Sequence, residues 1–89
     1  MDQSLLRPSS DVVSRRLGDS AVLICLSTSR IYELNTTGAR IWELIEPGAT
    51  LDSVLDTLAR EFLGARDRLQ VDVSDLVTML SAHGLLARS

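Results

Sequence analysis

The sequence has no lysine, one cysteine and one histidine, and these scarcities exclude several classes of function. Cys25 alone cannot form an intrachain disulfide, and together with His83 it cannot supply the four ligands of a structural zinc site. A catalytic triad needs an imidazole beside a nucleophile, but His83 is expected at a helix end and Cys25 lies within an apolar strand. We therefore expect a protein that is not an enzyme and that uses neither a metal nor another cofactor.

Positive charge is also scarce, because nine arginines face twelve acidic residues and the net charge is −3. A nucleic-acid-binding domain needs a cationic surface to displace counterions from phosphates. No basic amphipathic helix is visible, and the longest apolar run, residues 21–26, is far shorter than the ~20 residues that span a bilayer. The sequence predicts a cytoplasmic protein that binds neither nucleic acid nor membranes.

The 89 residues are enough for one domain, and their 45% apolar content indicates a folded core. Residues 1–10 are mostly polar and contain Pro8, so we expect a flexible N-terminal arm followed by a single domain over residues 11–89. Three short β-rich segments, 12–17, 21–26 and 30–34, are separated by brief turn sequences, which predicts an antiparallel meander.

After residue 34 the apolar period changes from 2 to 3.6, and this change predicts helices over about 37–46, 51–62 and 70–83, with residues 63–69 as a polar link. Trp42 on the first helix is expected to fill the core. The predicted fold class is α+β, with a three-stranded antiparallel sheet followed by three helices in a winged helix-turn-helix-like arrangement.

Two features indicate a binding surface. Residues 21–26 are apolar at every position, so the face of the sheet away from the helices is an exposed apolar patch unless the arm, with Leu5 and Leu6, folds over it. Residues 30–34 form an edge strand, whose unpaired backbone groups can accept an added strand. The alternative is that Arg30 and Glu33 only protect this edge from aggregation.

Residues 32–42, YELNTTGARIW, resemble the signature Y-x-L-N-x-T-G-x-x-I-W of the PqqD family. A second block resembles the D-V-x-x-L … G-L-L ending of that family and consists of Asp72, Val73, Leu76, Leu80, Gly84, Leu85 and Leu86. The resemblance covers about residues 11–86, and its two blocks occur in the expected order. It implies a recognition element for ribosomally synthesised, modified peptides (RiPPs).

Such elements are winged-helix-like domains that bind the leader of a precursor peptide as an added strand, beside the third strand and against the third helix. They deliver the leader to a modifying enzyme. A separate chain of this size is similar to the leader-binding proteins of lasso-peptide clusters, whose partner is a leader peptidase and whose leader carries a Tyr-x-x-Pro motif.

The resemblance and the edge strand together define the candidate peptide-binding residues. On one side of the added strand we expect Val22 and Ile24, flanked by Tyr32, and on the other the third helix. The full set is Val22, Ile24, Arg30, Ile31, Tyr32, Glu33, Leu34, Asp72, Asp75, Leu76, Met79 and His83.

Three alternatives remain open. The chain could be a PqqD-type chaperone that hands a precursor to a radical enzyme in pyrroloquinoline quinone assembly. A DNA-binding winged helix is disfavoured, because residues 70–83 contain Asp72 and Asp75 but no basic residue other than His83. A dimerisation domain, in which two edge strands pair with each other, is the third alternative.

Overall fold

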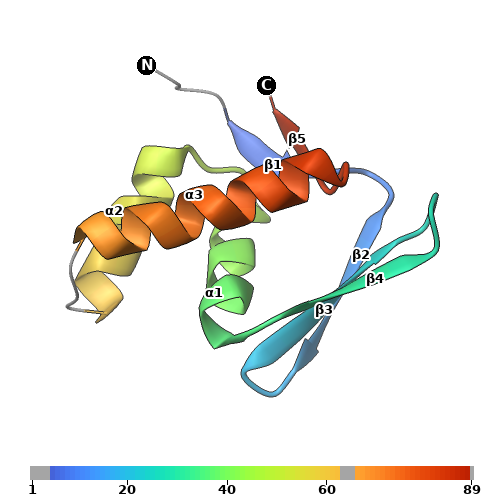
Figure 1. The fold of residues 1–89 in the computed structure, drawn as a ribbon, viewed down its shortest axis with the longest axis horizontal. Coiled ribbons are helices and arrows are strands. Elements are labelled where there is room, and N and C mark those ends of the chain that lie inside the picture. The colour runs from blue at the N-terminus through green and yellow to red at the C-terminus, as the bar shows by residue number, and fades with distance from the viewer. Residues whose placement is uncertain (1–4, 63–65, 89) are drawn as a thin grey trace.

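A computed structural model of the protein describes residues 5–62 and 66–88, which form one α+β unit (Figure 1). Its elements follow in the order β1 (Leu6–Pro8), β2 (Val12–Leu17), β3 (Ser20–Cys25), β4 (Arg30–Leu34), α1 (Thr36–Ile45), α2 (Leu51–Phe62), α3 (Arg66–Ala82) and β5 (Leu86–Arg88). The three-stranded sheet followed by three helices confirms the predicted fold class.

The sheet has the strand order β2-β3-β4, with both pairs antiparallel. Its inner face, which packs against α1 and α3, carries the buried side chains of Ala21, Leu23, Cys25 and Leu34. The opposite, outer face carries Val22 and Ile24 of β3 with their cross-strand neighbours. One face of the central strand is thus part of the core, and the other is directed away from the helices.

The helix boundaries follow from local capping. The side chain of Asn35 accepts a hydrogen bond from the Gly38 amide at 2.9 Å at the start of α1, and Thr50 caps α2 through the Ser53 amide. Gly84, with a φ of +73°, follows α3 in the left-handed conformation that commonly ends helices. Because the cap residue Asn35 directly follows β4, the first turn of α1 lies at the end of the edge strand.

The N-terminal arm is a correction to the sequence prediction, because Leu6–Pro8 is a strand that pairs with β5. Leu6 also exchanges backbone hydrogen bonds with Ala49, and its side chain is buried among residues of α1, α2 and α3. A terminal segment is ordered when its backbone and an apolar side chain are both held. The remaining part of the predicted arm, residues 1–4, lies outside the described residues.

α3 begins at Arg66, four residues before the predicted start at Gln70. The polar residues between 66 and 69 are compatible with a helix, and Asp67 in the first turn interacts favourably with the helix dipole. α3 therefore reaches further along the helical layer than the apolar pattern alone indicates.

Candidate functional site

The free edge of β4 is the first component of the site, because β4 pairs with β3 alone among the described strands. The Leu26 amide donates to the Asp11 carbonyl at 2.9 Å, which continues the β2–β3 register. Hydrogen-bonded and non-bonded pairs alternate in an antiparallel ladder, so Leu23 directs its backbone groups to β4, where its partner is Tyr32. The N–H and C=O groups of Ile31 and Glu33 therefore point to the open edge.

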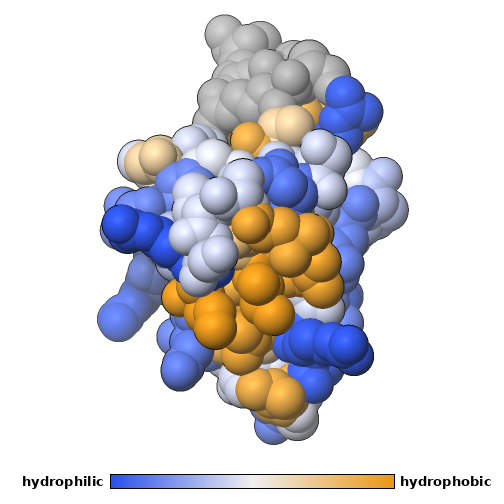
Figure 2. Space-filling model, turned by 90° about the vertical axis from the view of Figure 1, so that its right-hand side faces the viewer, coloured by the Kyte–Doolittle hydropathy of each residue, from blue (hydrophilic) through white to orange (hydrophobic). Residues whose placement is uncertain are grey.

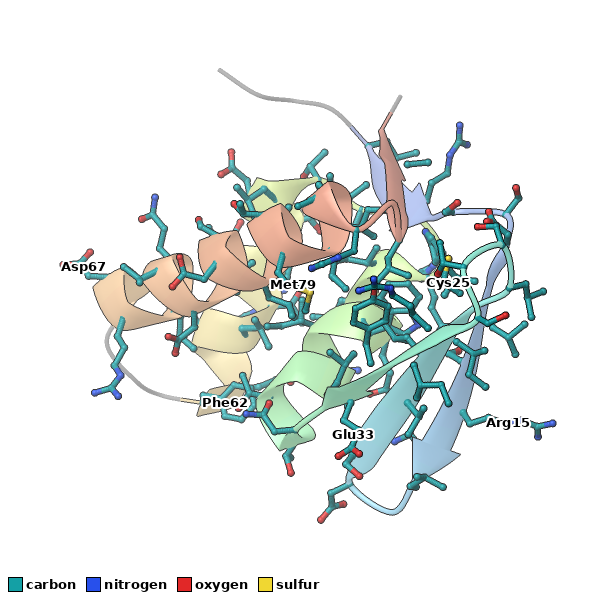
Figure 3. All side chains as sticks on the ribbon, turned by 45° about the vertical axis from the view of Figure 1, so that its right-hand side comes forward. Arg15, Cys25, Glu33, Phe62, Asp67 and Met79 are labelled. Atoms are coloured by element: carbon teal, nitrogen blue, oxygen red, sulfur yellow. The ribbon has the colours of Figure 1, made fainter. Side chains whose placement is uncertain are left out.

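The second component is the side of α3 that faces this edge. Met79 is half-buried against the sheet-side core and points from α3 toward the sheet (Figure 3). The rings of Tyr32 on β4 and His83 just after α3 lie 5.2 Å apart. Leu34, the last residue of β4, is buried in the same core. These residues bring the inner face of the edge strand and α3 together.

The third component is a hollow of about 430 Å³ at the end of β4, lined by Asn35, Thr37, Gly38, Ile41, Asp72, Asp75 and Leu76. Leu76 and the buried Ile41 supply apolar surface, and the exposed Asp72 and Asp75 supply negative charge. A β-carbon at Gly38 would lie 3.3 Å from Asn35 Oδ1, so glycine permits the close approach of α1 to the strand end. A ligand that follows the edge of β4 past Leu34 would reach this hollow.

The structure separates nine of the twelve predicted site residues into two groups, and the other three are Arg30 and the two aspartates that line the hollow, Asp72 and Asp75. Tyr32 and Leu34 face α3, where Leu76, Met79 and His83 lie on or just after the helix. Arg30 lies exposed at the start of β4. Val22, Ile24, Ile31 and Glu33 lie on the outer face. The expectation that Tyr32 flanks Val22 and Ile24 is wrong, because neighbouring strand residues point to opposite faces and Tyr32 is paired with the buried Leu23.

Sequence reasoning did not assign Asn35, Thr37, Gly38 and Ile41 to the site, although all four belong to the 32–42 motif. Asn35 and Gly38 serve as a helix cap and a close contact, and Ile41 is a core residue, so each has a structural role as well. The motif contains these four residues, but they line the hollow only because the tertiary fold places α3 beside the start of α1.

A chain of ion pairs on another surface connects the sheet to the helices. Arg16 on β2 forms an ion pair with Glu43 on α1 at 2.6 Å. Arg40 lies between Glu43 and Glu61, and its Nε and Nη2 donate to the Glu61 carboxylate at 2.9 Å and 2.5 Å. The hydrogen bond from Arg16 lowers the pKa of Glu43, and that from Arg40 lowers the pKa of Glu61. The network holds α1 against both β2 and α2.

We expect this network to make part of the stability dependent on acid. A carboxyl whose pKa is lowered on folding stabilises the protein above its unfolded pKa, and the contribution is lost as the pH falls through the folded value. Thermal melts from pH 7 to pH 3 should therefore show a smaller acid-induced fall in Tm for Glu61→Gln than for the wild type. The difference should be a few degrees at most, because the pairs are partly exposed. Glu33→Gln, outside the network, is the control, and an unchanged pH profile in Glu61→Gln would contradict the prediction.

Other chemistry is sparse within residues 5–62 and 66–88. No group of three or more potential metal-ligating side chains occurs there, and none of the described helices is long and apolar enough to cross a membrane. Cys25 is buried, and a hydrogen bond between its thiol and the Ser27 hydroxyl lowers the thiol pKa. The features that stand out are the open edge, the adjoining side of α3 and the hollow.

A family model and two solved structures are similar to this chain. The family model described as coenzyme PQQ synthesis protein D (PqqD) matches residues 20–86. A solved structure titled "TbiB1 in Complex with the TbiA(beta) Leader Peptide" is 31% identical, with a TM-score of 0.84 over 90% of this chain and 93% of that chain. The fold is also that of "Lasso peptide synthetase B1 complexed with the leader peptide", at 23% identity and a TM-score of 0.81 over 92% of this chain and 96% of that chain. No curated protein sequence matches the chain. The match over residues 20–86 shows that the chain belongs to the PqqD family.

Proposed function

We propose that this protein is a non-catalytic recognition element that binds the leader of a ribosomally synthesised precursor peptide and presents it to a separate processing enzyme. For a lasso precursor, that enzyme is a leader peptidase. The observation that carries the proposal is the open edge of β4 beside α3, in a chain 31% identical to a protein solved with a leader peptide. The leader is added as a strand, as in other cases of β-augmentation.

The geometry supports an antiparallel leader. The open N–H and C=O groups of Ile31 and Glu33 offer four backbone hydrogen bonds to such a strand. Leader side chains opposite Tyr32 and Leu34 then point toward α3, because directly opposed residues share a face. The N-terminal end of this strand lies at the end of β4, next to the hollow with Asp72 and Asp75. Basic leader residues upstream of the strand would be attracted there.

We expect Tyr32→Ala and Met79→Ala to weaken leader binding by about 1–2 kcal/mol each, or roughly 5–30-fold in Kd. Tyr32 borders the strand-addition edge from the inner face, and Met79 is an adaptable apolar contact on α3. The measurement is calorimetric titration with a synthetic lasso-precursor leader that carries a Tyr-x-x-Pro motif. Leu17→Ala, an exposed apolar truncation on the far edge strand, is the matched control.

In the same titrations, Asp72→Ala and Asp75→Ala should have smaller effects that decrease with added salt, because exposed ion pairs are screened. Thermal melts establish that each variant is folded. If all four variants bind as the wild type does, the leader does not lie between β4 and α3, and the proposed site is wrong.

The family description also supports a second candidate, the chaperone of pyrroloquinoline quinone assembly. Both candidates require binding of a precursor peptide, so the precursor distinguishes them. A lasso leader that binds at least about tenfold more tightly than a quinone precursor peptide supports the first candidate, and the reverse order supports the second. In either case the isolated protein is expected neither to cleave nor to modify the peptide.

A further inference from the structure

The outer face of the sheet is apolar, and no described segment covers it. Its apolar side chains are Val13, Leu17, Val22, Ile24, Leu26 and Ile31, of which Ile31 is 65% exposed. Figure 2 shows this side of the molecule, with an apolar area at its centre and strongly hydrophilic residues on both sides. Leu6 is buried among the helices and Leu5 packs near Gly48, so the first described residues do not cover the face.

The register arranges the outer face in two rows across the strands. One row contains Val13, Ile24 and Ile31, and the next contains Arg15, Val22 and Glu33. The second row therefore has a positive charge on one edge strand, an apolar centre and a negative charge on the other edge strand. Arg15 and Glu33 project from opposite edges of the sheet (Figure 3), and neither forms a salt bridge within the described residues.

From this charge pattern we infer that the occupant of the outer face is a second copy of this chain. Consider two sheets packed face to face and related by a two-fold axis parallel to β3. The rotation places β2 of one copy over β4 of the other, so each Arg15 lies over the partner copy's Glu33. Val22 and Ile24 meet their own equivalents, and Val13 meets Ile31. Both ion pairs and the apolar centre are thus satisfied in one aligned sheet packing.

The other two-fold arrangement in the plane of the interface does not fit. An axis across the strands places β2 of one copy over β2 of the other. Arg15 then lies either over Arg15 of the second copy or over the row of that copy that contains Val13. Like charges or charges facing apolar side chains oppose association. The pattern of Arg15 and Glu33 therefore selects the axis parallel to β3.

This dimer leaves the proposed leader site open, although both involve β4. The dimer uses the outer-face side chains of Ile31 and Glu33, whereas the leader pairs with their edge-directed backbone groups and contacts α3 on the inner side. The three strands of the outer face have six, six and five residues. At a strand spacing of about 4.8 Å and a rise of about 3.4 Å per residue, they cover roughly 300 Å², which is less than the ~800 Å² per partner of a standard stable interface. The dimer should accordingly be weak, with a dissociation constant of roughly 0.1 mM.

Sedimentation equilibrium of the full chain between ~10 µM and ~1 mM tests the inference. The wild type should approach twice its 9.7 kDa mass at the upper concentrations. Arg15→Glu or Glu33→Arg alone should weaken association at least about tenfold, because two attractive contacts become repulsive. An equimolar mixture of these two variants should associate again, since each supplies the charge that the other lacks. Arg60→Glu on α2 is the control for net charge.

A wild type that remains monomeric at ~1 mM would overturn the inference and leave the outer face to a different protein. The proposed arrangement would be overturned if neither charge reversal weakened the dimer, or if the two variants did not associate on mixing. A dimer formed by pairing of two β4 edges, for example, would not be weakened by Arg15→Glu. Leader titration of Arg15→Glu separates this test from the proposed function, because that variant should bind the leader as the wild type does.

Discussion

Trp42→Ala is expected to unfold the protein. Trp42 is 2% exposed and lies on α1 in the core between the helices and the sheet. Truncation of a buried tryptophan costs about 3–5 kcal/mol, which is a large part of the ~5–15 kcal/mol that stabilises a typical domain. Urea unfolding followed by circular dichroism should show no stable native baseline, or a midpoint far below that of the wild type.

Trp42→Phe separates the loss of volume from the loss of the indole. The indole Nε1–H is buried and has no hydrogen-bond partner among the described residues. Replacing the indole therefore breaks no hydrogen bond with them. Phenylalanine keeps most of the apolar contact, and we expect this variant to fold with a loss of about 1–2 kcal/mol. A stable Trp42→Ala protein that only fails to bind leader would show instead that Trp42 belongs to the binding site.

The main elements could be predicted because their patterns were regular. α2 coincides with the predicted residues 51–62, where apolar residues recur at helical spacing, and α1 and β3 differ from prediction by one residue. The β1–β5 pair was missed because each strand has three residues, too few to show a period. Its partners lie at opposite ends of the sequence, and only the tertiary fold brings them together.

The candidate site was only partly predictable for a related reason. Alternation along residues 30–34 indicates that successive side chains face opposite ways, but it does not show which set faces α3. The buried Leu23 opposite Tyr32 determines this, and it places Tyr32 apart from Val22 and Ile24. The phase of the hydrogen bonds likewise depends on the contact between Leu26 and Asp11, which propensity does not reveal.

That phase leads to the second prediction, which concerns the leader backbone. In the proposed complex, only the leader amides opposite Ile31 and Glu33 can donate to the open edge of β4, because backbone groups on alternate residues point to opposite sides of a strand. N-methylation at two leader positions, two residues apart, should therefore weaken binding strongly. Each change removes a hydrogen bond and inserts a methyl group between the strands, for a loss of about 1–3 kcal/mol, or roughly 5–150-fold in Kd.

The residue between these two positions is the internal control. Its amide points away from β4, so its N-methylation should change Kd by less than about threefold, although its side chain faces Tyr32 and α3. Alanine at the same position should give the opposite result and weaken binding, because it removes the proposed side-chain contact with Met79 and leaves the backbone intact. Strand addition therefore predicts that N-methylation weakens binding at every second leader position. Alanine substitution should weaken binding at the positions in between, whose side chains face α3. A uniform response to N-methylation would contradict strand addition, and the orientation of the Ile31 and Glu33 backbone would then have no role in recognition.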